Sequence, residues 1–123
     1  MQTHSQRWIL AAVVYFCLAI MLGVFMGASH DHSLMPVHAH INLLGWVSMT
    51  LIGVIYHFFP QAGASRTATV QFWLHNVALV VMMVSLSVLL RGNEQVEPVV
   101  GMSSLAMLVA VLLFAGNVLY RRA

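Results

Sequence analysis

The sequence predicts an all-α membrane protein, a single domain of four transmembrane helices arranged as an up-down bundle. Hydrophobic residues make up 61% of its 123 residues and charged residues 7%, with a mean hydropathy of +0.90. In average chains about a quarter of the residues are charged. The apolar residues also fall into four uncharged stretches of about 20 residues, the length at which a helix crosses a ~30 Å hydrocarbon core.

The predicted spans, in chain order, are Trp8–Ala28, Val37–Phe59, Val70–Leu90 and Val99–Tyr120. Backbone N–H and C=O groups find no water in lipid, so each span is expected to be helical. The first span is longer than the apolar core of a secretory signal peptide, and it is therefore predicted to be a membrane helix.

Prolines and glycines set the expected ends and contacts of these helices. Pro36 disfavours helix at the residue before it and is accepted in a first helical turn, so the second span is expected to start near Val37. Pro60 predicts its end, and the Gly/Ser/Ala-rich stretch Gln61–Thr69 predicts an inner loop. The pair Gly23 and Gly27 predicts that two helices approach closely. A narrow stripe with little bulk at two positions runs along the second span: Gly45, Met49, Gly53 and Tyr56.

The charges predict how the bundle is oriented. Arg7, Arg66, Arg121 and Arg122 fall on one side of a four-span topology, and Arg91 alone falls on the other. Because positive residues favour the cytoplasmic side, both termini are expected inside, in a bacterial-type inner membrane. The three acidic residues fall in the loops expected outside: Asp31, Glu94 and Glu97. A formal net charge of +2 gives no indication of a nucleic-acid partner.

Histidine is rare in hydrocarbon because a polar ring there needs a partner. The second predicted span has His40 near its start and His57 near its end, about 25 Å apart along the axis at ~1.5 Å per residue. The third has His75 near its start. Spans two and three are joined by a short loop and are expected to be antiparallel neighbours. This topology predicts that His57 and His75 lie together near the inner surface.

Imidazole binds haem iron, copper and zinc. A membrane haem b needs an axial histidine, usually a second one across the ring, and an apolar slot between helices. The candidate cofactor ligands are His40, His57 and His75. The outer histidines His30, His32 and His38 offer an alternative copper or zinc site. However, side chains two residues apart on a helix point to nearly opposite sides, which weakens a site that uses both His38 and His40. A third alternative is that these rings only form hydrogen bonds.

The stretch His38-Ala-His-Ile-Asn-Leu-Leu-Gly-Trp-Val, continued by Gly53-Val-Ile-Tyr56 and Pro60, resembles the second helix of subunit I in the haem–copper oxidase superfamily. It is most similar to the nitric oxide reductase-like branch, in which a His-x-Asn-Leu-Leu motif precedes Gly, Tyr and Pro at similar spacing. Phe72-Trp-Leu-His-Asn76 also resembles short membrane proteins described as oxidase subunit I-like. The resemblance covers about a third of the chain.

This resemblance implies that His40 is an axial ligand of a low-spin haem b. The family's second axial ligand, its high-spin haem ligand and its binuclear-centre histidines lie on later helices that have no counterpart here. Stand-alone oxidase activity is therefore not expected. A second copy of the chain could supply the opposite imidazole, and so could His30, His32 or His38.

Three function classes remain open. The first is a haem b-binding protein for electron transfer or for handling haem or a diatomic gas, working as a homo-oligomer. The second is a copper- or zinc-binding membrane protein, and the third is a cofactor-free subunit of a respiratory complex. The sequence has no nucleophile–base pair, Gly-rich phosphate loop or paired carboxylates, which argues against hydrolase and kinase chemistry.

Overall fold

The computed structural model describes residues 3–121. Its elements are α1 (Thr3–Ser29), α2 (Met35–His40), η1 (Ile41–Val47), α3 (Ser48–Phe58), α4 (Pro60–Gly63), α5 (Arg66–Leu90), η2 (Glu94–Val96) and α6 (Glu97–Tyr120). The segments α2, η1 and α3 follow one another without a break and form one long helix. This helix and α1, α5 and α6 are long and apolar enough to cross a membrane. The predicted all-α, four-span fold class is confirmed.

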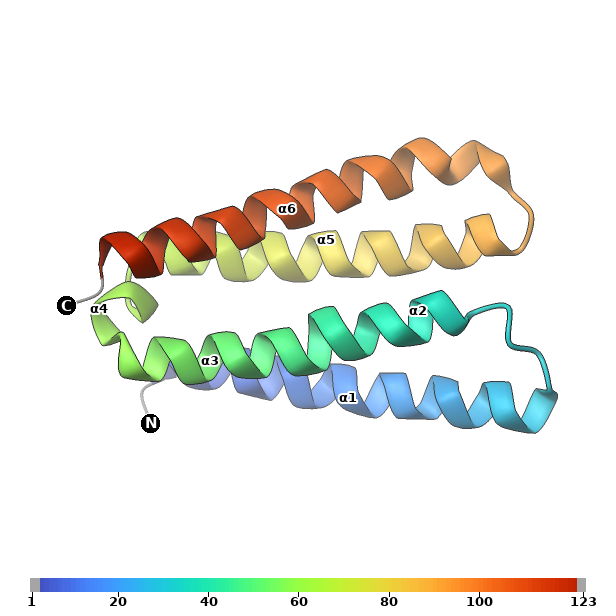
Figure 1. The fold of residues 1–123 in the computed structure, drawn as a ribbon, viewed down its shortest axis with the longest axis horizontal. Helices are drawn as coiled ribbons and strands as arrows, with labels where there is room; N and C mark the ends of the chain where they lie inside the picture. Colours follow the sequence, from blue (N-terminus) through green and yellow to red (C-terminus); the bar gives the residue numbers. More distant parts are fainter. Residues whose placement is uncertain (1–2, 122–123) are drawn as a thin grey trace.

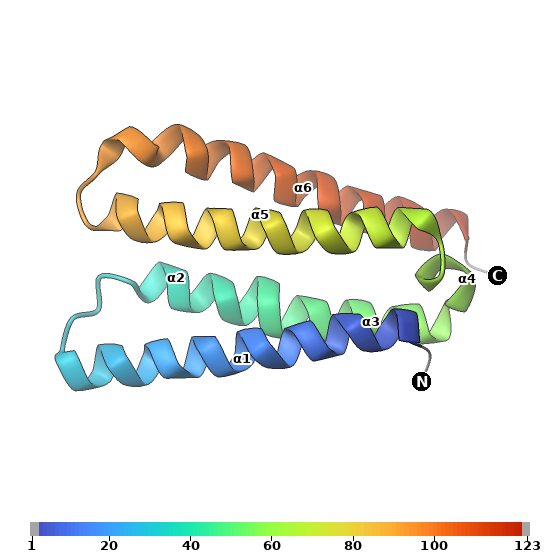
Figure 2. The ribbon, with the colours of Figure 1, turned by 180° about the vertical axis from the view of Figure 1, so that it is seen from behind.

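The four long helices form two antiparallel hairpins that lie side by side (Figures 1 and 2). One hairpin pairs α1 with α2–η1–α3, the other pairs α5 with α6, and α4 joins them. Both ends of the described chain lie at the same end of the bundle as α4 (Figure 1). Arg7, Arg66 and Arg121 therefore share one end, here called the arginine end. Arg122 lies outside the described residues, and the direction of the bundle across the membrane stays a prediction.

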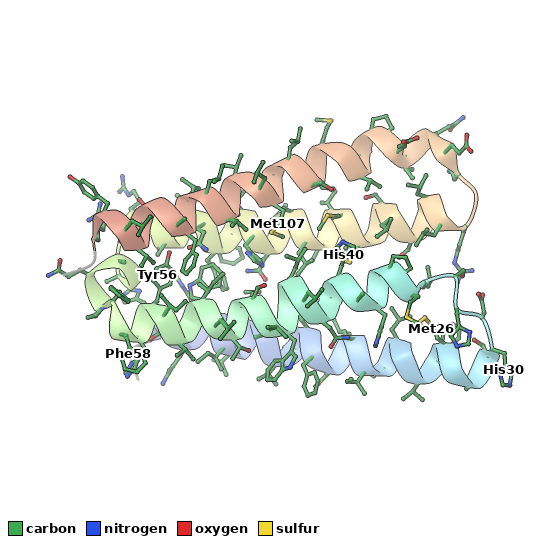
Figure 3. The ribbon with its side chains drawn as sticks, viewed as in Figure 1. Met26, His30, His40, Tyr56, Phe58 and Met107 are labelled. Atoms are coloured by element: carbon green, nitrogen blue, oxygen red, sulfur yellow. The ribbon has the colours of Figure 1, made fainter. Side chains whose placement is uncertain are left out.

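The opposite end, here called the histidine end, carries the turn between α1 and α2 and the turn between α5 and α6. His30, whose φ is +58°, lies in the first of these turns (Figure 3). His38 and His40 follow it on α2. The histidines expected to lie together outside the membrane therefore belong to one end of the bundle.

The helices extend beyond the predicted spans at several ends. The prediction of a loop at Gln61–Thr69 is wrong, because Pro60–Gly63 forms α4 and α5 begins at Arg66. Ser65 caps α5, since its Oγ accepts a hydrogen bond from the Ala68 N–H at 3.1 Å. A capping serine supplies one of the partners that a helix start lacks, and the helix can begin before the apolar stretch does. The apolar stretches thus mark the position of each helix in the sequence and not its ends.

The predicted small-residue stripe is buried against α1. A Cβ at Gly45 would lie 2.6 Å from Tyr15 Cβ, and a Cβ at Gly53 would lie 2.7 Å from Ile9 Cγ1. Only glycine therefore permits this approach of the two backbones. The pair Gly23 and Gly27 behaves differently: a Cβ at Gly23 would meet the His38 ring at 2.9 Å, whereas Gly27 has nothing within 4 Å.

Trp8 belongs to one of the two core clusters and is fully buried. Its ring meets the edges of Phe72 and His75 on α5, with centroids 5.0 and 5.8 Å apart, and lies 5.9 Å from Tyr56 on α3. The contacts with Phe72 and His75 tie the first hairpin to the second. The indole therefore contributes to the packing between the two hairpins.

A buried polar network at the arginine end also joins the two hairpins. Asn117 Nδ2 donates to Tyr56 Oη at 3.1 Å and to the Ala62 carbonyl at 2.9 Å. Ser65 Oγ donates to Asn117 Oδ1 at 3.2 Å, and the Tyr56 hydroxyl donates to Gln71 Oε1 at 2.5 Å. Hydrogen bonds between membrane helices contribute roughly 0.6 kcal/mol each, up to about 1.7. The network fixes the register of α3, α5 and α6.

Candidate functional site

The histidine motif of the second span coincides with a change of helix type. The chain is α-helical to His40 and then forms a π-helix over Ile41–Val47, which is the Ile-Asn-Leu-Leu-Gly-Trp-Val part of the motif. Short π-helical segments inside α-helices are found disproportionately at functional sites. No pattern in the sequence indicates this segment, because its apolar residues fit an α-helix equally well.

His38 uses both ring nitrogens inside the protein. Its Nδ1 lies 2.8 Å from the Ala19 carbonyl of α1, and since a carbonyl only accepts, Nδ1 carries the proton. Its Nε2 can then accept from Asn42 Nδ2, at 3.4 Å. The ring is half-buried and packs against Gly23. It therefore serves the packing of α1 on α2 and has no lone pair left for a metal ion.

His40 has a different arrangement. Its Nδ1 donates to the Pro36 carbonyl at 2.7 Å, one turn earlier on the same helix. In the neutral ring this leaves the lone pair on Nε2. The side chain is exposed and projects from the end of α2 toward α5 (Figure 3). A backbone carbonyl that holds Nδ1–H and leaves Nε2 free is the arrangement that orients histidine ligands toward metals.

His75 is fully buried in the middle of the bundle. Its Nε2 donates to the Leu44 carbonyl of the π-helix at 2.8 Å. Its Nδ1 is buried and has no hydrogen-bond partner among residues 3–121. The ring thus ties α5 to the motif segment with one nitrogen. The other nitrogen is closed off from any exterior ligand.

A mostly apolar cavity of about 250 Å³ lies beside this segment and is here called the central groove. Its walls come from η1 and α3 on one side and α6 on the other, with His75 of α5 between them. The lining residues are Leu44, Ser48, Leu51, Ile52, Ile55, His75, Val111 and Phe114. His40 is not among these lining residues, but Leu44 follows it by four residues on the same long helix. Ser48, Val111 and Phe114 were not singled out from the sequence.

The prediction that His57 and His75 lie together is wrong. His57 is exposed near the arginine end, beside Phe58, which projects away from the bundle (Figure 3). His75 lies opposite Leu44, which is thirteen residues from His57, or about 20 Å along the helix at ~1.5 Å per residue. Because α5 begins at Arg66 rather than Val70, His75 lies more than two turns inside the bundle.

The outer histidines do not form a ligand set in this structure. Among residues 3–121 no group of three His, Cys, Asp or Glu side chains is placed to hold a metal ion. His30 and His32 are exposed in the turn, whereas His38 points into the α1 contact. The neighbouring Asp31 carboxylate accepts from the Ser33 N–H at 3.0 Å, which holds the pKa of that carboxyl below its usual value. The copper or zinc alternative gains no support from this geometry.

Comparison with protein-family models, with curated proteins and with solved structures finds no match to this chain.

Proposed function

We propose that this chain is a haem b-binding membrane protein in which His40 is an axial iron ligand and a second copy of the chain completes the site. The observation that supports this most is the His40 ring, with Nδ1–H bonded to the Pro36 carbonyl at 2.7 Å and Nε2 free on an exposed side chain. Haem irons in membrane and soluble proteins are commonly held by histidine.

The other candidate ligands are less suited to this role. His38 has both nitrogens engaged, whereas His75 has its Nε2 on the Leu44 carbonyl and its Nδ1 buried. His57 is exposed, but no carbonyl orients its ring among the described residues. His40 combines an accessible lone pair with a fixed ring orientation, and it is also the residue that the family resemblance selects.

The central groove supports a shared site rather than a site within one chain. It offers an apolar wall, as a porphyrin requires, and Leu44 in this wall lies four residues after His40. Its volume of about 250 Å³ falls below the roughly 300–1,000 Å³ of sites that enclose cofactors and drug-sized ligands. One chain therefore supplies one iron ligand and one wall of the proposed haem site. In the proposed homodimer the second chain supplies the other ligand and the other wall.

A haem bound in this way would supply one-electron redox chemistry. The residues of this chain would hold and orient it: the Pro36 carbonyl fixes the ligand tautomer, and the apolar groove residues exclude water. We place this activity in a bacterial-type inner membrane with the arginine end in the cytoplasm, on the charge distribution alone. Electron transfer, or handling of haem or a diatomic gas, is the function class that such a site serves.

Absorption spectra of the purified protein test the proposal. Dithionite-reduced wild type should show the split α-band of a six-coordinate b-type haem. His40→Ala should lose it, while His57→Ala, an exposed histidine on the same long helix, should keep it. A wild-type protein without haem would overturn the proposal, and so would a His40→Ala spectrum equal to that of wild type. Copper or zinc without porphyrin in elemental analysis would favour the metal-ion alternative.

A further inference from the structure

Two adjoining hollows lie at the arginine end, between the start of α5 and the end of α6. One has a volume of about 260 Å³ and includes Arg66, and the other has about 250 Å³ and includes Arg121. Thr67 and Leu113 line both, so the two hollows form one continuous surface. It is here called the arginine groove. It lies on the opposite half of the bundle from His40.

The arginine groove carries positive charge that no Asp or Glu side chain among residues 3–121 neutralises. All three acidic residues of the sequence, at positions 31, 94 and 97, belong to the histidine end. Arg66 and Arg121 are both exposed. Arg66 is also the first residue of the 25-residue helix α5, whose N-terminal dipole adds partial positive charge. Arg7 is differently placed, because it donates to Thr69 Oγ1 at 3.2 Å and stacks on Phe72.

Below the two arginines the groove becomes apolar. Val70, Leu112 and Leu113 line it on the side of the hydrocarbon. Gly116 lines it as well, and a Cβ at that position would find nothing within 4 Å. The surface therefore combines a cationic rim with an apolar wall that continues into the membrane. An amphiphile with an anionic head and acyl chains has the complementary chemistry.

We propose that the arginine groove is a binding site for an anionic phospholipid, whose phosphate lies between Arg66 and Arg121 and whose acyl chain runs past Gly116. Basic pockets between membrane helices near the cytoplasmic surface bind anionic headgroups in this way. Arginine offers a planar set of donors that pairs with phosphate oxygens in a bidentate manner. A zwitterionic headgroup carries its own ammonium and gains less from the two arginines.

Native mass spectrometry of the delipidated protein tests this with phosphatidylglycerol and phosphatidylcholine of identical acyl chains. Each arginine near a charged surface contributes on the order of a fivefold change in affinity. Phosphatidylglycerol should therefore bind more tightly than phosphatidylcholine. The Arg66→Gln/Arg121→Gln protein should lose roughly thirtyfold in affinity for it. Arg91→Gln, an exposed arginine at the histidine end, should bind as wild type does.

Two further measurements distinguish binding of the whole lipid from binding of its phosphate group alone. Gly116→Phe keeps both arginines and fills the apolar wall, so it should also weaken phosphatidylglycerol binding. Inorganic phosphate should not compete at concentrations equal to the lipid. Equal binding of the two lipids, an unchanged double variant, or competition by inorganic phosphate would each overturn the proposal. The measurement needs no haem, so its outcome is independent of the function proposed for His40.

Discussion

Replacing Gly45 by alanine tests the close packing that positions the motif segment. A Cβ at this position would lie 2.6 Å from Tyr15 Cβ and 2.7 Å from Tyr15 Cγ. The first of these atoms is attached directly to the α1 backbone, so no rotamer change of Tyr15 relieves the clash. The π-helix and α1 must move apart, and overpacking of this kind costs about 1–3 kcal/mol.

Gly27→Ala is the matched control, because a Cβ there meets nothing within 4 Å. Both substitutions carry the intrinsic helix preference of alanine over glycine, about 1 kcal/mol. The difference between their free energies of unfolding therefore isolates the strain at Gly45 and should be about 1–3 kcal/mol. Reversible unfolding in mixed detergent micelles, followed by circular dichroism, measures it. A difference below about 0.5 kcal/mol would show that the two helices do not approach as closely as described.

Three further perturbations have defined outcomes in the same unfolding assay or by elemental analysis. Tyr15→Phe removes the 2.8 Å hydrogen bond to Asn76 Oδ1 and should destabilise the fold by about 0.6–1.7 kcal/mol; no change would mean that this bond does not form. Asn117→Ala breaks the network at the arginine end and should cost about 1–3 kcal/mol, whereas Ser87→Ala, which loses only a bond within α5, should cost little. His30→Ala combined with His32→Ala should leave the content of bound iron, copper and zinc unchanged. A loss of copper or zinc would support a metal site formed by the outer histidines.

Composition and hydropathy were enough to predict the fold class. The four apolar stretches correspond to the four long helices, because a chain in lipid has no alternative to helical hydrogen bonding. The small-residue stripe of Gly45, Met49, Gly53 and Tyr56 was also visible, and all four residues are buried. Helix ends were less predictable. They depend on caps such as Ser65, which lies outside the apolar pattern.

The candidate site was predictable only in part. The opposite directions of His38 and His40 followed from helical geometry, whereas the family resemblance of the motif around His40 stays a prediction. The prediction that His57 and His75 lie together was wrong, because the depth of His75 in the bundle was counted from the end of a predicted loop. Most of that loop is helical in the structure. The π-helix and the Leu44 contact of His75 depend on tertiary packing, and no local pattern encodes them.

The ratio of haem to protein tests the central claim most directly. The pyridine haemochromogen absorbance gives the amount of haem b, and amino-acid analysis of the same sample gives the amount of chain. If His40 of each of two copies ligates one iron, wild type should contain about one haem for two chains, and His40→Ala should contain almost none. A ratio of about one haem for each chain, in a protein that sedimentation shows to be a monomer, would contradict the shared site.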